Sequence, residues 1–83
     1  MNPMFDLQAA KSCVHMFESL HAYPTDGGWN LYLRFTDTDE DSTSGILVKS
    51  RTIEPKLYKT LETIAKDADT IGFNAFEVHL DGF

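Results

Sequence analysis

The stretch from Trp29 to Ile53, WNLYLRFTDTDEDSTSGILVKSRTI, is predicted to form two strands joined by an acidic loop. Over residues 29–36 every second residue is apolar. A period of two is typical of a strand with one buried face and one exposed face. The residues expected on the buried face are Trp29, Leu31, Leu33 and Phe35.

Residues 46–53 are rich in β-branched and apolar side chains and are expected to form the second strand. Leu47 falls on the same face of this strand as Lys49. Because a lysine is rarely buried unpaired, the core face is predicted to be the opposite one, with Ile46 and Val48.

An amphipathic helix is predicted before this hairpin. Asp6 can accept hydrogen bonds from the backbone N–H groups of the following turn, which makes it a candidate N-cap. Apolar residues then recur at helical spacing as far as Leu20. The helix should end near His21, because Pro24 disfavours helical geometry at the residue before it.

A second helix and a third strand are predicted after the hairpin. Pro55 suits the first turn of a helix, and Gly72 suits the position just past a helix end. Residues 76–80 alternate between apolar and polar and are expected to form the short third strand. The apolar stripe of the second helix would consist of Leu57, Leu61, Ile64, Ala65, Ala68 and Ile71.

The expected fold is α+β, a two-layer α/β sandwich with the order α-β-β-α-β in a single domain over residues 1–83. A three-stranded, mainly antiparallel sheet should carry both helices on one face. The third strand is expected beside residues 29–36, which gives the strand order 2-1-3. The alternative is a parallel position beside residues 46–53.

Composition limits the classes of function. Seven basic and thirteen acidic residues give a net charge of −6, which argues against direct binding of nucleic acid and favours a partner with a basic surface. Cys13 is the only cysteine, so no intramolecular disulfide can form, as suits a reducing cytoplasm. Neither a signal peptide nor an apolar run of the roughly 20 residues that a membrane span needs is visible. The chain is expected in the cytoplasm, or in the cytoplasm of a host.

The loop between the two central strands is a candidate contact surface. An EF-hand loop counted from Asp37 would require glycine and glutamate where Ser42 and Val48 stand, so calcium is disfavoured. Two interpretations remain: a solvated hairpin loop, and an acidic surface for a basic partner. The candidate contact residues here are Asp37, Asp39, Glu40 and Asp41.

The exposed face of the predicted sheet is a second candidate surface. Tyr32 and Arg34 should stand on it, and both residue types are enriched in protein interfaces. A platform for single-stranded nucleic acid is disfavoured, because one exposed aromatic and an acidic chain do not suit stacked bases and phosphates. A plain polar sheet face is the alternative.

Two groups of histidines and carboxylates could carry chemistry. His15, Glu18 and His21 recur at three-residue spacing, which spreads them over too wide an arc of a helix to hold one metal. Glu77 and His79 alternate on one face of the third strand, where they could form an acid–base pair or hold a metal. Any exposed strand face has the same pattern, so no catalytic residue, metal ligand or cofactor is predicted.

The leading hypothesis is a small acidic, non-enzymatic binding protein that engages and inhibits or modulates a protein partner. One form is an inhibitor from a phage or mobile element that blocks a nucleic-acid-binding host protein, by analogy with small acidic proteins of that type. The alternatives are a regulatory or structural homodimer, and a small metal-binding or hydrolytic domain that uses Glu77 and His79. The patterns are too general to indicate a family.

Overall fold

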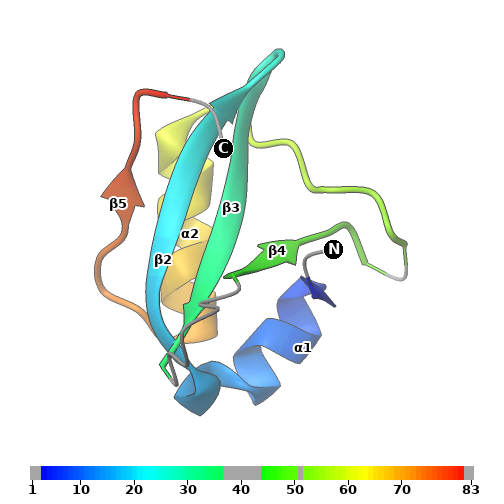
Figure 1. The fold of residues 1–83 in the computed structure, drawn as a ribbon, viewed down its shortest axis with the longest axis vertical. Coiled ribbons are helices and arrows are strands. Elements are labelled where there is room, and N and C mark those ends of the chain that lie inside the picture. Colours follow the sequence, from blue (N-terminus) through cyan, green and yellow to red (C-terminus); the bar gives the residue numbers. More distant parts are fainter. Residues whose placement is uncertain (1–2, 37–43, 51, 82–83) are drawn as a thin grey trace.

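The computed structural model describes residues 3–36, 44–50 and 52–81, and these residues form an α+β fold with one sheet and two helices. The five strands have the order β1-β4-β3-β2-β5 (Figure 1). The sheet is mixed, so the prediction of three mainly antiparallel strands is wrong. The elements are β1 (Met4–Phe5), α1 (Leu7–Ser12), the 3₁₀ turn η1 (Val14–Met16), β2 (Phe17–Thr25), β3 (Gly28–Phe35), β4 (Ser44–Leu47), α2 (Leu61–Ile71) and β5 (Glu77–Val78).

The centre of the sheet is a long antiparallel hairpin of β2 and β3. Its turn is Asp26-Gly27, and Gly27 has a φ of 85°, which glycine adopts without strain. Leu31 and Leu33 of β3 are fully buried, as predicted from the alternation of residues 29–36. Their register partners on β2 are also fully buried, so the hairpin supplies the middle of the core.

The first predicted helix is correct in its beginning and wrong in its length. The N–H of Ala9 donates to Asp6 Oδ1 at 2.8 Å, which confirms the N-cap, but α1 ends at Ser12. The chain then enters β2, where an irregularity between Phe17 and Ser19 shifts the register. Such a bulge places one extra residue in the strand, so Phe17 and Leu20 both face the core at a spacing of three. That spacing imitates a helix.

The predicted faces of the second hairpin strand are reversed. Leu47 is fully buried in the main core, whereas Ile46 and Val48 belong to a separate small cluster around Tyr32. Ile46 is the antiparallel partner of Tyr32, so both side chains point away from Leu33. The argument from Lys49 fails because β4 ends at Leu47, before the lysine.

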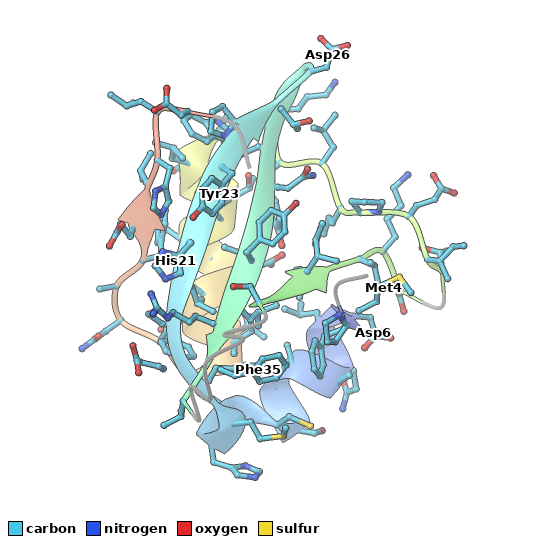
Figure 2. The ribbon with its side chains drawn as sticks, in the orientation of Figure 1. Met4, Asp6, His21, Tyr23, Asp26 and Phe35 are labelled. Carbon is cyan, nitrogen blue, oxygen red and sulfur yellow. The ribbon has the colours of Figure 1, made fainter. Side chains whose placement is uncertain are left out.

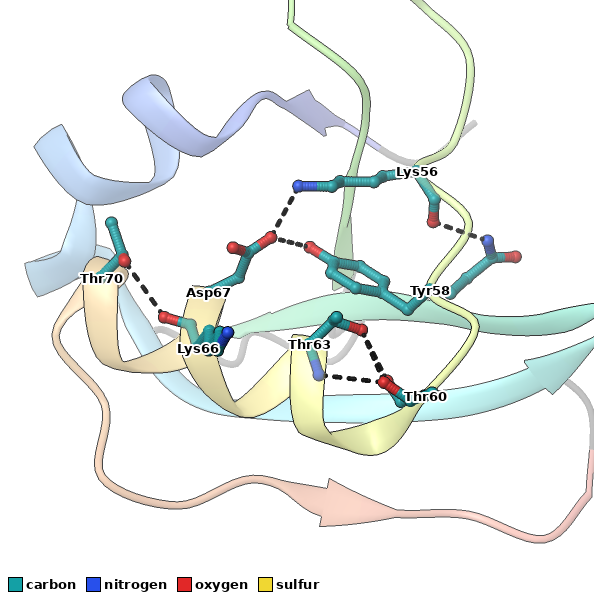
Figure 3. A network of polar contacts seen from close by, with 8 residues as sticks. Lys56, Tyr58, Thr60, Thr63, Lys66, Asp67 and Thr70 are labelled. Carbon is teal, nitrogen blue, oxygen red and sulfur yellow. Dashed lines mark hydrogen bonds and ion pairs between the residues drawn. The ribbon is translucent and has the colours of Figure 1, made fainter.

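The second helix begins later than predicted. α2 starts at Leu61, where the N–H of Thr63 donates to Thr60 Oγ1 at 3.3 Å and makes Thr60 the N-cap (Figure 3). Pro55 instead forms an isolated bridge with Val48. Gly72 follows the last turn as predicted, with a φ of 124°. The stripe residues that the fold buries are Ile64, Ala68 and Ile71.

The last strand pairs with β2 and not, as predicted, with β3. β5 runs parallel to β2, with Ala22 opposite Val78, and the N–H of His79 donates to the carbonyl of Ala22 at 2.8 Å. Both edges of β3 already pair with β2 and β4, so no edge of β3 remains for β5. The predicted order 2-1-3 is therefore wrong.

Both helices pack on one face of the sheet. Ala10 of α1 and Ile64 of α2 are fully buried in the same core cluster as Leu33, and Figure 1 shows α2 lying behind β2 and β3. Within the described residues, no helix is long and apolar enough to cross a membrane.

A polar network ties the outer side of α2 to the segment that precedes it (Figure 3). Asp67 Oδ2 accepts hydrogen bonds from Tyr58 Oη at 2.6 Å and from Lys56 Nζ at 2.8 Å. Burial is the main cause that raises the pKa of Tyr58, and the hydrogen bond to Asp67 raises it further. The hydroxyl therefore stays a donor at neutral pH. This cluster has a structural role, since it fixes segment 56–58 against the helix.

Candidate functional site

The predicted contact residues fall into two groups. Asp37, Asp39, Glu40 and Asp41 lie outside the described residues. Tyr32 and Arg34 lie on the face of the sheet opposite the core, as their alternation with Leu31 and Leu33 requires. Tyr32 is only 7% exposed, because it packs in the small cluster with Ile46 and Val48. The Arg34 side chain is 45% exposed, and its Nε lies 3.9 Å from Glu18 Oε2.

The same face continues onto β2 and β5, where it gathers two histidines and a carboxylate. His21 and Tyr23 stand on the side of β2 away from α2 (Figure 2). His21 is the register partner of Glu77. His79 lies two residues beyond Glu77, on the same face of the strand. The parallel pairing of β2 with β5 therefore brings residues 58 positions apart in the sequence into contact.

Three donor atoms of these residues form a small triangle. His21 Nδ1 lies 3.0 Å from His79 Nε2, and His79 Nε2 lies 3.1 Å from Glu77 Oε2. The third side, from His21 Nδ1 to Glu77 Oε2, is 3.9 Å. Ser19 Oγ contacts the other ring nitrogen of His21, Nε2, at 2.7 Å. All polar atoms of the His21 ring are therefore engaged.

One placement of protons satisfies these contacts together. His79 Nε2–H donates toward both Glu77 Oε2 and His21 Nδ1, and His21 Nε2–H donates to Ser19 Oγ. In this arrangement the lone pairs of His21 and Glu77 converge on one proton of His79. A site in which several lone pairs converge can hold a proton or a metal cation.

The surroundings favour a neutral His21. Its side chain is 12% exposed, and burial is the main cause that lowers its pKa below the ordinary value. The carboxylates of Glu77 and Glu18 oppose this shift, whereas His79 and Arg34 reinforce it. At neutral pH the imidazole of His21 is therefore uncharged and able to offer a lone pair.

An aromatic contact orients the second histidine. The ring of His79 stacks on Tyr23 with a centroid distance of 4.0 Å and an angle of 7° between the planes. Tyr23 in turn meets Tyr32 edge to face at 5.4 Å. These rings link the histidine cluster to the middle of the sheet and restrict rotation of the His79 imidazole.

The sequence predicted two of the three members of this cluster. Glu77 and His79 were expected on one strand face, but His21 was assigned to a helix with His15 and Glu18. His15 lies in η1 and is exposed, so that group of three does not form a helical face. The signal for the third member, His21, was the alternation of Ser19, His21 and Tyr23 with apolar Leu20 and Ala22.

Within the described part of the chain, His21, Glu77 and His79 form a group of three metal-ligating side chains whose donor atoms all lie within 4.8 Å of one another. Comparison of the chain with protein-family models, with curated proteins and with solved structures finds no match.

Proposed function

We propose that the chain is a small, non-enzymatic binding protein that engages a protein partner through the face of its sheet that the helices leave bare. We call this surface the open sheet face and define it by Glu18, His21, Tyr23, Arg34 and His79. The observation that carries the proposal is the placement of a tyrosine, an arginine and two histidines together on this face, while both helices pack on the other.

These residue types suit a contact surface. Tyrosine and arginine contribute a large share of the binding energy in protein interfaces, because they combine apolar area with directed hydrogen bonds. Tyr23 is held between His79 and Tyr32, so little side-chain entropy would be lost when a partner covers it. Arg34 has a carboxylate 3.9 Å away, which limits its freedom in the same way.

The charge of the chain indicates the kind of partner. With thirteen acidic and seven basic residues, the protein attracts a basic surface at long range. The proposed steering charges belong to the acidic segment that begins at the residue after Thr36, namely Asp37, Asp39, Glu40 and Asp41. A partner whose basic surface binds nucleic acid would be blocked by such a protein, and this inhibitory role is part of the proposal.

The test combines capture of a partner with kinetics on matched variants. Tagged wild-type protein should retain a specific protein from lysate of its source, and Tyr23→Ala with Arg34→Ala should weaken that complex mainly through faster dissociation. A truncated hot spot costs at least ~2 kcal/mol, about thirtyfold in affinity. Glu62→Ala with Lys66→Ala, two exposed positions on α2, is the matched control and should bind as wild type does.

Substitution of Asp39, Glu40 and Asp41 by their amides should instead slow association and reduce the dependence of affinity on salt. Sedimentation of the free protein will separate capture of a partner from self-association. If a captured partner binds all of these variants as it binds wild type, the open sheet face and the acidic segment do not contact it and the proposal is wrong.

A further inference from the structure

We propose that His21, Glu77 and His79 form a binding site for a divalent first-row transition ion, for which Zn²⁺ is the best-suited probe. The ligands would be His21 Nδ1, Glu77 Oε2 and His79 Nε2. This site needs no protein partner, so it stands or fails independently of the proposed binding function.

The separations of the three donor atoms match the requirements of such an ion. Zinc binds nitrogen and oxygen ligands at about 2.0–2.2 Å in tetrahedral geometry, which places any two ligands roughly 3.3–3.6 Å apart. The observed separations are 3.0, 3.1 and 3.9 Å. Shifts of a few tenths of an ångström would equalise them. Glu77 is the natural side chain to move, since it is 64% exposed.

The ligand types select the class of ion. Two imidazoles and one carboxylate suit zinc and its first-row neighbours, whereas magnesium and calcium prefer oxygen ligands alone. Three protein ligands leave at least one coordination position open for water or another ligand. The carboxylate also offsets part of the charge of a divalent ion, and its exposure gives the ion a path from solvent.

Both imidazole rings are already oriented toward the ion, and binding replaces the proton on His79 Nε2, which is released to solvent. Metal-bound histidines almost always donate their second ring N–H to a neighbouring acceptor, which fixes the tautomer. Ser19 Oγ lies 2.7 Å from His21 Nε2 and fills this role when Nδ1 faces the ion. The stack on Tyr23 holds the plane of the His79 ring. Arg34 is the nearby positive charge that opposes a cation, and Glu18 beside it counteracts that effect.

A purely structural role for the cluster predicts a different response to metal. If the three side chains serve only as a hydrogen-bonded contact between β2 and β5, a proton occupies the point where the lone pairs converge. The protein would then show no specific response to zinc. A metal site and a purely hydrogen-bonded contact therefore differ in whether zinc binds and in whether zinc shifts the resonances of His21 Nδ1 and His79 Nε2.

The experiment is a titration of chelator-stripped protein with Zn²⁺. Calorimetry measures the stoichiometry and affinity, and the side-chain ¹⁵N resonances of the histidines show which ring nitrogens bind the ion. We expect one equivalent to bind, with the resonances of His21 Nδ1 and His79 Nε2 moving while those of His15 stay in place. Ser19→Ala should weaken binding about 10–100-fold, as is typical for the loss of an outer hydrogen-bond partner. Glu77→Gln and His79→Gln should abolish the one-equivalent binding.

His15→Ala is the matched control, because it removes an exposed histidine outside the cluster and should leave binding unchanged. Mg²⁺ at the same concentration should cause no shift of the histidine resonances. The amide spectrum of each variant will show that it is folded, and Glu77→Gln keeps the proposal testable because its side chain is mostly exposed. Absence of zinc binding by the wild-type protein, or retention of it by folded Glu77→Gln and His79→Gln, would overturn the proposal.

Discussion

Replacement of Leu47 by alanine should lower the free energy of unfolding by about 2–5 kcal/mol, as is typical when a fully buried leucine is truncated. Leu47 is 0% exposed and belongs to the main core under the helices. The domain is small, and total stabilities of about 5–15 kcal/mol are usual, so the variant should be partly unfolded at moderate temperature. Chemical denaturation followed by circular dichroism will measure the loss.

This prediction separates the observed strand faces from those expected from the sequence. If Leu47 faced solvent together with Lys49, its truncation would change stability by no more than about 0.5 kcal/mol. Ile53→Ala is the matched control, since Ile53 is 76% exposed and should behave in that way. Equal, small effects of the two substitutions would show that the assigned core face of β4 is wrong.

Replacement of Gly28 by alanine should be similarly damaging for a different reason. A Cβ atom at Gly28 would lie against the carbonyl oxygen of Tyr58 and 3.1 Å from Leu57 Cδ1. That carbonyl accepts the N–H of Trp29 at 2.8 Å, and the N–H of Tyr58 donates to the carbonyl of Trp29 at 2.9 Å. The added methyl group would push segment 57–58 away and break this exchange.

We expect Gly28→Ala to cost about 3–5 kcal/mol, with about 1–3 kcal/mol from overpacking and about 1 kcal/mol from each lost backbone hydrogen bond. Thermal and denaturant melts measure the effect. Thr25→Ala is the control, because Thr25 is the register partner of Gly28 on β2 and is exposed. A Gly28→Ala protein as stable as this control would mean that segment 57–58 does not approach the hairpin.

The parts of the fold that were predictable are those where one local rule acts alone. Alternation over residues 29–36 predicts β3 and its buried face, and the side chain of Asp6 predicts a helix beginning after it. Gly72 predicts the end of α2, because few other residues easily adopt the positive φ that it has after the last helical turn.

The wrong predictions concern sequence patterns that are compatible with two different structures. The bulge after Phe17 gives a strand the spacing of a helix, so β2 was not expected and β5 lacked its true partner. Pro55 is compatible with a helix start, yet Thr60 provides the side chain that caps α2. Local sequence decides neither whether residues 17–20 form a strand or a helix nor where α2 begins. Tertiary packing decides both.

The candidate site was missed for the same reason. Two of the three metal-ligating side chains, Glu77 and His79, lie on β5 and directly after it, where alternation places them together. The third, His21, lies on β2, most of which was assigned to a helix. A site built from two strands far apart in sequence requires their pairing, and single-residue patterns do not contain that information.

The parallel pairing of β5 with β2 is the claim on which both the open sheet face and the metal site depend. Nuclear Overhauser contacts in the free, metal-stripped protein test it most directly. We predict contacts between the rings of Tyr23 and His79, and slow exchange of the His79 amide, which donates to Ala22 at 2.8 Å. Contacts from residues 77–79 to β3 or β4 instead, with none to β2, would contradict the account.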